Sequence, residues 1–293
     1  MNRPIAPWNN LWRCAAAAGL FRLLIGVSPA AGYEEITVTD GGALTGRVVL
    51  NGPPPPARIF HLIFSPNIDF CAKISDGKGN RLLKEFQTSA DGGLQHAVVA
   101  VVGVARGKAF DYAPKLQIDT CRIAPFVMPV RNRRPLAIVN HDPIAHDIQG
   151  YTLKDNYTFA MFNKQIVPES EAAREIRFRP NHYIFRTQCG VHDFMQSWGL
   201  AVGNPYFAVT GPDGRFRIED LPPGDYDVIA WHPHMNVQAG RITIPPGGTA
   251  SVDFAFDAAD ADIPLHDLQT GYRLETALQP RHLAAPPVEL QTP

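Results

Sequence analysis

Hydrophobic positions in this chain alternate with polar ones far more often than they recur at helical spacing. A period of two is the pattern of a strand with one buried face, and a continuous β-branched run indicates a strand buried on both faces. Glycine and proline separate these runs throughout, which is typical of β-sandwiches. We therefore predict an all-β chain. The expected strands are residues 44–50, 95–103, 135–140, 174–179, 183–189, 200–202, 206–210, 214–218, 224–231, 240–244 and 249–256.

Composition narrows the function classes. The 293 residues include 27 Pro and 24 Gly, which favour turns over long helices. The 45% hydrophobic and 19% charged fractions exclude a chain that is disordered as a whole. Lys and Arg (27) nearly balance Asp and Glu (28), so the basic stripe of a general nucleic-acid binder is not expected.

Residues 1–30 have the pattern of a secretory signal peptide. Arg3 and Arg13 precede an apolar run, and Ser28 and Ala30 supply small residues before a cleavage site. The alternatives are a membrane anchor or an N-terminal helix, but Arg22 interrupts the run and leaves it too short to span. We expect a periplasmic or secreted protein with no membrane span in the mature chain.

Cleavage would remove Cys14 and leave Cys71, Cys121 and Cys189. Three is an odd number. In an oxidising compartment it indicates one disulfide and one thiol with a different task.

The candidate chemistry lies in residues 138–148 and 183–195. Together they supply His146, Cys189, His192 and Met195. A thiolate, two imidazoles and a weak axial thioether are the ligands of a mononuclear blue-copper site. Cys189 is expected at a strand end, with a tight loop bringing the next two ligands back to the same metal, while His146 comes from a distant loop.

At these positions the chain resembles the cupredoxins. Cys189-x2-His-x2-Met is similar to the short ligand loop of the amicyanin type. Tyr183-x-Phe185 resembles the aromatic strand that leads into the copper cysteine, and Asn140…His146 resembles the loop that supplies the first histidine. The resemblance covers roughly residues 90–204. It implies one type 1 copper ion held by the four residues named above, in a Greek-key β-sandwich, and a periplasmic dehydrogenase or cytochrome as redox partner.

Two features depart from this pattern or compete with it. Asp147 follows His146 where the family commonly has Asn. An aspartate is a poorer orienting donor, so we expect this departure to affect the surroundings of the ligand and the reduction potential. His141 is a rival first histidine, although it lies too close to Asn140 for the family pattern. Zinc is the alternative metal, but it favours closed Cys and His sets and Met is a poor zinc ligand.

A closed set of four ligands leaves no position for a substrate. We therefore expect an electron carrier rather than an enzyme, with the exposed edge of His192 as electron port, ringed by Pro143, Ile144 and Phe194. The alternatives are a copper-binding or copper-delivery protein, or an extracytoplasmic binding module with a structural copper. A multicopper oxidase is not expected, because it would need several His-x-His motifs and only His232-x-His234 fits that pattern.

The remaining cysteines, Cys71 and Cys121, are expected to form the disulfide, with two free buried thiols as the alternative. His232, His234 and Met235 offer a possible second metal site. A strand end whose histidines form hydrogen bonds is the preferred interpretation, because no third strong ligand is near in sequence.

Residues 209–228 resemble the carboxypeptidase regulatory-like (transthyretin-like) β-module, and residues 44–52 resemble its opening strand. The cupredoxin would then be inserted into this module; two modules in tandem is the alternative. The expected organisation is signal peptide 1–30, first module strand and linker 31–56, copper domain 57–204, remainder of the module 205–257, and a tail 258–293 with a short helix near 267–277.

Overall fold

The computed structural model describes residues 32–154 and 157–263, and this part of the chain is mostly strands. The all-β prediction is confirmed. The expected signal peptide and the helix expected near 267–277 lie outside the described residues. In the segments that are described, no helix is long and apolar enough to cross a membrane.

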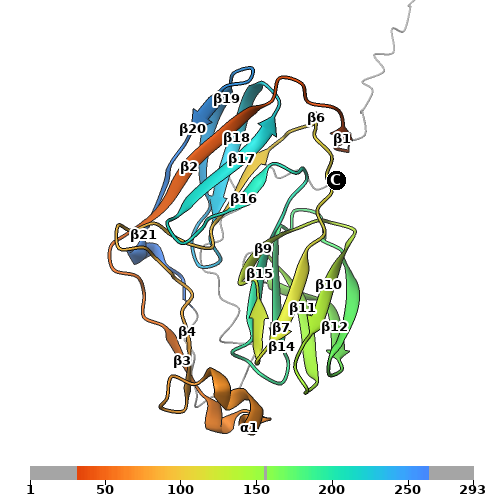
Figure 1. Cartoon of the computed structure of the whole chain (residues 1–293), viewed down its shortest axis with the longest axis vertical. Helices are drawn as coiled ribbons and strands as arrows, with labels where there is room; N and C mark the ends of the chain where they lie inside the picture. Colours follow the sequence, from red (N-terminus) through yellow and green to blue (C-terminus); the bar gives the residue numbers. More distant parts are fainter. Residues whose placement is uncertain (1–31, 155–156, 264–293) are drawn as a thin grey trace, which may run out of the picture. The chain divides into compact units, whose positions relative to one another are not determined.

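Eight strands form what we call the first sandwich (Figure 1). One sheet has the order β16 (Phe207–Val209), β5 (Val98–Val102), β18 (Gly224–Trp231), β19 (Gln238–Ile244). The other has the order β17 (Arg215–Leu221), β2 (Gly42–Asn51), β20 (Thr249–Ser251), with β21 (Phe254–Asp257) also paired to β2.

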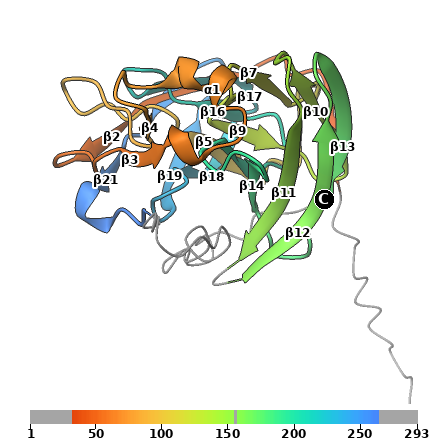
Figure 2. The ribbon, with the colours of Figure 1, turned by 90° about the horizontal axis from the view of Figure 1, so that it is seen from below.

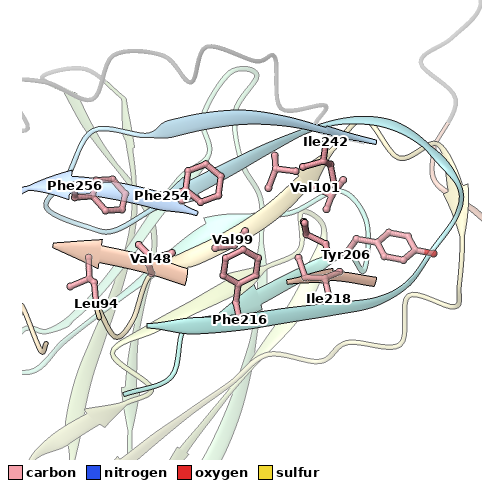
Figure 3. Packing of buried hydrophobic residues seen from close by; sticks show 14 of the residues in the cluster. Val48, Leu94, Val99, Val101, Tyr206, Phe216, Ile218, Ile242, Phe254 and Phe256 are labelled. Atoms are coloured by element: carbon pink, nitrogen blue, oxygen red, sulfur yellow. The ribbon is translucent and has the colours of Figure 1, made fainter. Parts of the chain in front are cut away.

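The core of the first sandwich receives side chains from both of its sheets, including Val99 of β5, Phe216 of β17 and Phe254 of β21 (Figure 3). Strand β5 is buried along its whole length because its two faces serve different cores. Val99 and Val101 face this core, whereas Val98, Ala100 and Val102 belong to a cluster that also contains Trp198 and Leu200. Alternation on a pleated strand thus explains the continuous apolar run seen in the sequence.

Nine strands form the second sandwich. Its four-stranded sheet has the order β13 (Ser170–Ile176), β10 (Arg134–Asn140), β7 (Lys115–Asp119), β8 (Arg122–Ala124). Its five-stranded sheet has the order β12 (Tyr157–Ile166), β11 (His146–Lys154), β14 (Ile184–Cys189), β15 (Gln196–Ala201), β9 (Val127–Val130). The long strands β11 and β12 lie side by side (Figure 2).

Packing and strand register bring the candidate ligands to one end of the second sandwich. Leu116 and Leu136 from one sheet pack with Phe185 and Ile148 from the other. In the antiparallel pair of β11 and β14, Ile148 lies opposite Cys189. The start of β11 and the end of β14 are therefore neighbours, although 43 residues separate His146 from Cys189.

The second sandwich lies, in chain order, between β5 and β16 of the first. These two strands pair directly, with Phe207 opposite Ala100, so the chain leaves and re-enters the first sandwich on adjacent strands. Close ends are what make an insertion tolerable. The domain ranges 57–204 and 205–257 stay a prediction. Strand β5 falls within the range 57–204 but pairs with β16 and β18, which fall within 205–257.

A β-hairpin with helical turns lies outside the two sandwiches. Strands β3 (Arg58–His61) and β4 (Asn80–Leu83) pair, and between them lie η1 (Leu62–Phe64), α1 (Ile68–Cys71) and η2 (Ala72–Ile74) (Figure 1). We call residues 62–74 the cover segment. The remaining elements are β1 (Glu34–Glu35), paired with β6 (Arg106–Gly107), and η3 (Ala258–Asp260).

Candidate metal centre

A tight turn follows the end of β14. The backbone N–H of Cys189 donates to the carbonyl of Met195 at 3.0 Å, and the N–H of Met195 donates to the carbonyl of His192 at 3.0 Å. These two bonds close the loop on itself before β15 begins. The spacing Cys-x2-His-x2-Met therefore forms one compact turn, as the sequence analysis expected.

His146, the first residue of β11, reaches the same place from the neighbouring strand. The N–H of Gly190 donates to the carbonyl of Asp147 at 2.7 Å, which ties the turn after β14 to the start of β11. The ligand atoms of His146, Cys189 and His192 all lie within 4.8 Å of one another. Cys189 Sγ is 3.8 Å from His146 Nδ1 and 3.7 Å from His192 Nδ1.

Each imidazole uses its other nitrogen for a second contact. His146 Nε2 lies 2.9 Å from Asp142 Oδ2. His192 Nε2 lies 3.1 Å from the carbonyl oxygen of Pro66 and 3.6 Å from Cys71 Sγ. An acceptor at Nε2 places the proton there and leaves the lone pair on Nδ1, on the side of the thiol.

Asp142 is held in place by backbone donors. The turn between β7 and β8 directs the N–H groups of Thr120 and Cys121 onto its two carboxylate oxygens. The side chain of Asn140 accepts from the N–H of Asp142 and donates to the carbonyl of Ile144 at 2.8 Å. The loop from β10 to β11 is thereby fixed. The motif Asp142-x3-His146 is the sequence signal for this contact, which was not predicted.

The predicted disulfide between Cys71 and Cys121 is confirmed, with its Cα atoms 5.5 Å apart. It ties the cover segment to the turn that holds Asp142. One covalent link thus lies beside the contacts of both imidazoles: Cys71 Sγ is next to His192, and the Cys121 N–H is bound to Asp142. That this disulfide borders the site was not predicted, because the pairing depends on segments 50 residues apart.

All four predicted ligands are buried, with exposed fractions of 0–1%. Burial raises the pKa of the Cys189 thiol, and hydrogen bonds from the backbone of Val191, His192 and Asp147 oppose that change in part. Burial lowers the pKa of His146, against the opposing effect of Asp142. Neutral imidazoles with a lone pair facing a sulfur are the forms in which these groups bind a metal.

The donor chemistry fits copper. A cysteine sulfur between two Nδ1 atoms is a soft, mixed S and N donor set, which copper accepts. Met195 lies in the same buried cluster as Cys189, at the end of the closed turn. The three residues His146, Cys189 and His192 can therefore hold a metal ion. Asp147, the departure noted in the sequence, accepts from the side chain of Gln149 at 3.2 Å rather than from a ligand ring.

The prediction that an exposed edge of His192 serves as the electron port is wrong. His192 is completely buried, and Phe194, which was expected in an exposed ring around it, is 2% exposed. The physical reason is the cover segment, whose Pro66 carbonyl occupies the outer edge of His192. His141, the rival first histidine, is exposed and lies outside the three-residue group.

His232 and His234 are buried and close to each other, with ring centroids 6.0 Å apart. They do not form a metal-ligand group in the described part of the chain. His232 Nε2 lies 3.2 Å from the carbonyl of Glu85, and His234 Nε2 lies 3.1 Å from its carboxylate. Burial lowers the pKa of His232 well below its ordinary value.

The solved structures to which the chain is similar include cupredoxins. The purple cupredoxin from Nitrosopumilus maritimus is 11% identical, with 30% of this chain and 98% of that chain covered and a TM-score of 0.25. Amicyanin from Paracoccus versutus is 13% identical, with 36% and 96% covered and a TM-score of 0.25. The copper-containing nitrite reductase from Thermus scotoductus is 13% identical, with 36% and 25% covered and a TM-score of 0.26.

No curated protein matches the chain. The model of the carboxypeptidase regulatory-like domain family matches residues 201–257, which include β16 to β21 of the first sandwich. The C-terminal part of the described chain thus has the family match that its sequence resemblance predicted.

Proposed function

We propose that the chain is an extracytoplasmic type 1 copper protein that carries single electrons between redox partners. The observation that carries this proposal is the convergence of His146 Nδ1, His192 Nδ1 and Cys189 Sγ in a buried cluster. Met195, at the end of the same turn, is proposed as the axial ligand. The signal-peptide pattern and the disulfide support an oxidising compartment.

The surrounding residues would keep the ligand set in one shape. Asp142 and the Pro66 carbonyl hold the two rings, and the closed turn holds Cys189 and Met195. Copper bound there would alternate between Cu(I) and Cu(II). Ligands that stay in place during that change favour fast electron transfer, and ligands held from behind are the usual means of fixing them.

Visible absorption and electron paramagnetic resonance of the chain with Cu(II) test this proposal. An intense thiolate-to-copper band is expected. It should bleach with ascorbate, return with ferricyanide and be absent from the Cys189→Ala variant. A colourless protein, or equal copper binding by the variant, would contradict the ligand assignment.

A structural copper is the second candidate, and the complete burial of His192 is the observation that favours it. The same experiment separates the two functions. A carrier is reduced and reoxidised repeatedly without loss of the band. A structural site keeps its metal but resists either reductant or oxidant. Copper delivery is disfavoured, because every proposed ligand lies out of reach of a second protein.

A further inference from the structure

The cover segment exposes two large apolar side chains. Within the described residues, the large hydrophobic side chains that are exposed are Ile59, Ile63, Phe64, Tyr157, Val167 and Val209. Ile63 and Phe64 are the most exposed of them, at 76% and 80%, and they are adjacent in η1. Leu62, in the same turn, is fully buried and anchors it. We call Ile63 and Phe64 the apolar tip.

The apolar tip lies two residues from the contact with a metal ligand. Phe64 is followed by Ser65 and Pro66, and the carbonyl of Pro66 accepts from His192 Nε2 at 3.1 Å. One side of the cover segment thus faces solvent, and the other touches the ring of His192. The rings of Phe194 and Phe60 lie beyond His192 and are buried.

The cover segment is fixed at both ends. The N–H of Leu62 donates to the carbonyl of Gly79 at 2.9 Å, and the N–H of Ser65 donates to the carbonyl of Leu62 at 2.8 Å. Cys71, at the end of α1, is joined covalently to Cys121. The contact between Pro66 and His192 is therefore part of a braced structure rather than of a loose loop.

The loop that carries the apolar tip has no net charge. Residues 62–79 contain two acids, Asp69 and Asp76, and two bases, Lys73 and Lys78. A partner attracted by charge would need an excess of one sign here. Two exposed side chains also offer only about 300 Å², far below the roughly 800 Å² that each partner contributes to a stable complex. Such a surface suits a short-lived contact with an uncharged, apolar surface.

We propose that the apolar tip is the docking surface for a redox protein whose cofactor edge is surrounded by uncharged apolar residues. This inference rests on the proposed function. In each encounter one electron passes through the backbone of residues 64–66 and the Pro66–His192 hydrogen bond. One protein is oxidised as the other is reduced, and no covalent bond or proton is exchanged. The tip replaces the edge of His192 that the cover segment buries.

Electron self-exchange between oxidised and reduced copies of the chain is the test, because a second copy presents the same uncharged surface. The Ile63→Ser/Phe64→Ser variant should exchange at least about tenfold more slowly. Its absorption band and reduction potential should be unchanged, since neither side chain is buried. Val167→Ser is the matched control. Val167 is exposed near Asn140 at the His146 side of the site, and its loss should leave the rate within about twofold.

Copper-free protein supplies a second readout. In a concentration series of nuclear magnetic resonance spectra, the amide shifts at residues 61–65 should move weakly, and the Ile63→Ser/Phe64→Ser variant should lose this change. A stable dimer through the tip would make a second copy the occupant and overturn the assignment to a redox partner.

The remaining outcomes separate the two proposals. An unchanged self-exchange rate in the double variant, or a slower rate in Val167→Ser alone, overturns the docking surface and leaves electron carriage intact. A copper site that cannot be cycled between its two oxidation states overturns electron carriage, and the docking proposal fails with it.

Discussion

Two pairs of buried histidines can be compared in this molecule. His146 and His192 lie at one end of the second sandwich, and His232 and His234 follow the end of β18 in the first. The ring centroids are 5.2 Å apart in the first pair and 6.0 Å apart in the second. Burial and proximity are thus nearly the same in both pairs.

The two pairs differ in what their ring nitrogens face. In the first pair each Nε2 has an acceptor, and each Nδ1 faces the sulfur of Cys189. In the second pair each nitrogen instead lies near a polar group of the protein other than a thiol. His232 Nδ1 accepts from the N–H of His234, and His234 Nδ1 lies 3.1 Å from the carbonyl of Asp262. Both Nε2 atoms contact Glu85.

This difference separates a candidate metal centre from a structural histidine cluster. A metal ligand needs one nitrogen tied to an acceptor and the other directed at a shared point with further donors. The second pair instead completes a buried network with Glu85 and Arg58. Burial would raise the pKa of Glu85, but His234 and Arg58 outweigh it and lower that pKa to about 2.

Matched glutamine variants give the largest expected contrast. His192→Gln should abolish the thiolate-to-copper band while the protein stays folded. His232→Gln should keep the band and lower the free energy of unfolding by about 1–3 kcal/mol, because buried polar groups lose their partners. Absorption spectra and denaturant unfolding of both variants check this. Loss of the band in His232→Gln would contradict the division between the pairs.

Glu85→Gln should destabilise the fold by about 3–5 kcal/mol, because it leaves Arg58 and His234 without their buried carboxylate. The wild-type carboxylate has a pKa of about 2 in the folded state, below its ordinary value of 4.5. Its contribution is therefore present above about pH 4.5 and lost as the pH falls toward 2.

Unfolding of wild type and Glu85→Gln at a series of pH values measures both effects. The variant should show a smaller loss of stability over that acid range. An equal loss in both proteins would mean that another group is responsible. Because Arg58 also contacts Gln196, next to Met195, a changed copper band in Glu85→Gln would show that the two regions are coupled.

The Cys71→Ala/Cys121→Ala variant should lose up to about 4 kcal/mol of stability, the loop-closure entropy of a 50-residue loop. It should also release the cover segment from the first histidine pair. In copper-free protein, Cys189 should then react faster with a thiol reagent than in wild type. An unchanged reaction rate, with the variant folded, would mean that the cover segment shields the site without its disulfide.

Asp142→Asn should have the smallest effect. The ring of His146 loses a charged acceptor, and copper affinity should fall about 10- to 100-fold. Asp147→Asn is the matched control, because the Asp147 side chain contacts Gln149 and not a ligand ring. Competition with a copper chelator measures both affinities. Equal losses in the two variants would contradict the assigned role of Asp142.

Several features followed from the sequence alone because they depend on short-range geometry or on counting. Alternation predicted the all-β fold, and the apolar run within residues 95–103 predicted the buried strand β5. The spacing Cys-x2-His-x2-Met leaves room for only a tight turn after β14. Once Cys189 was assigned to the metal site, Cys71 and Cys121 remained as the expected disulfide partners, which the structure confirms.

Other features needed the tertiary structure. The sequence favoured His146 over His141, but only the register of β11 against β14 places His146 beside Cys189. The hairpin of β3 and β4 carries the cover segment onto His192 from 126 residues away. A hydrophobic pattern reports which face of a strand is buried but not which distant segment lies on top of it. For that reason only long-range packing decided that His192 is buried. It also decided that the Pro66 carbonyl contacts His192 and that the Asp142 carboxylate contacts His146.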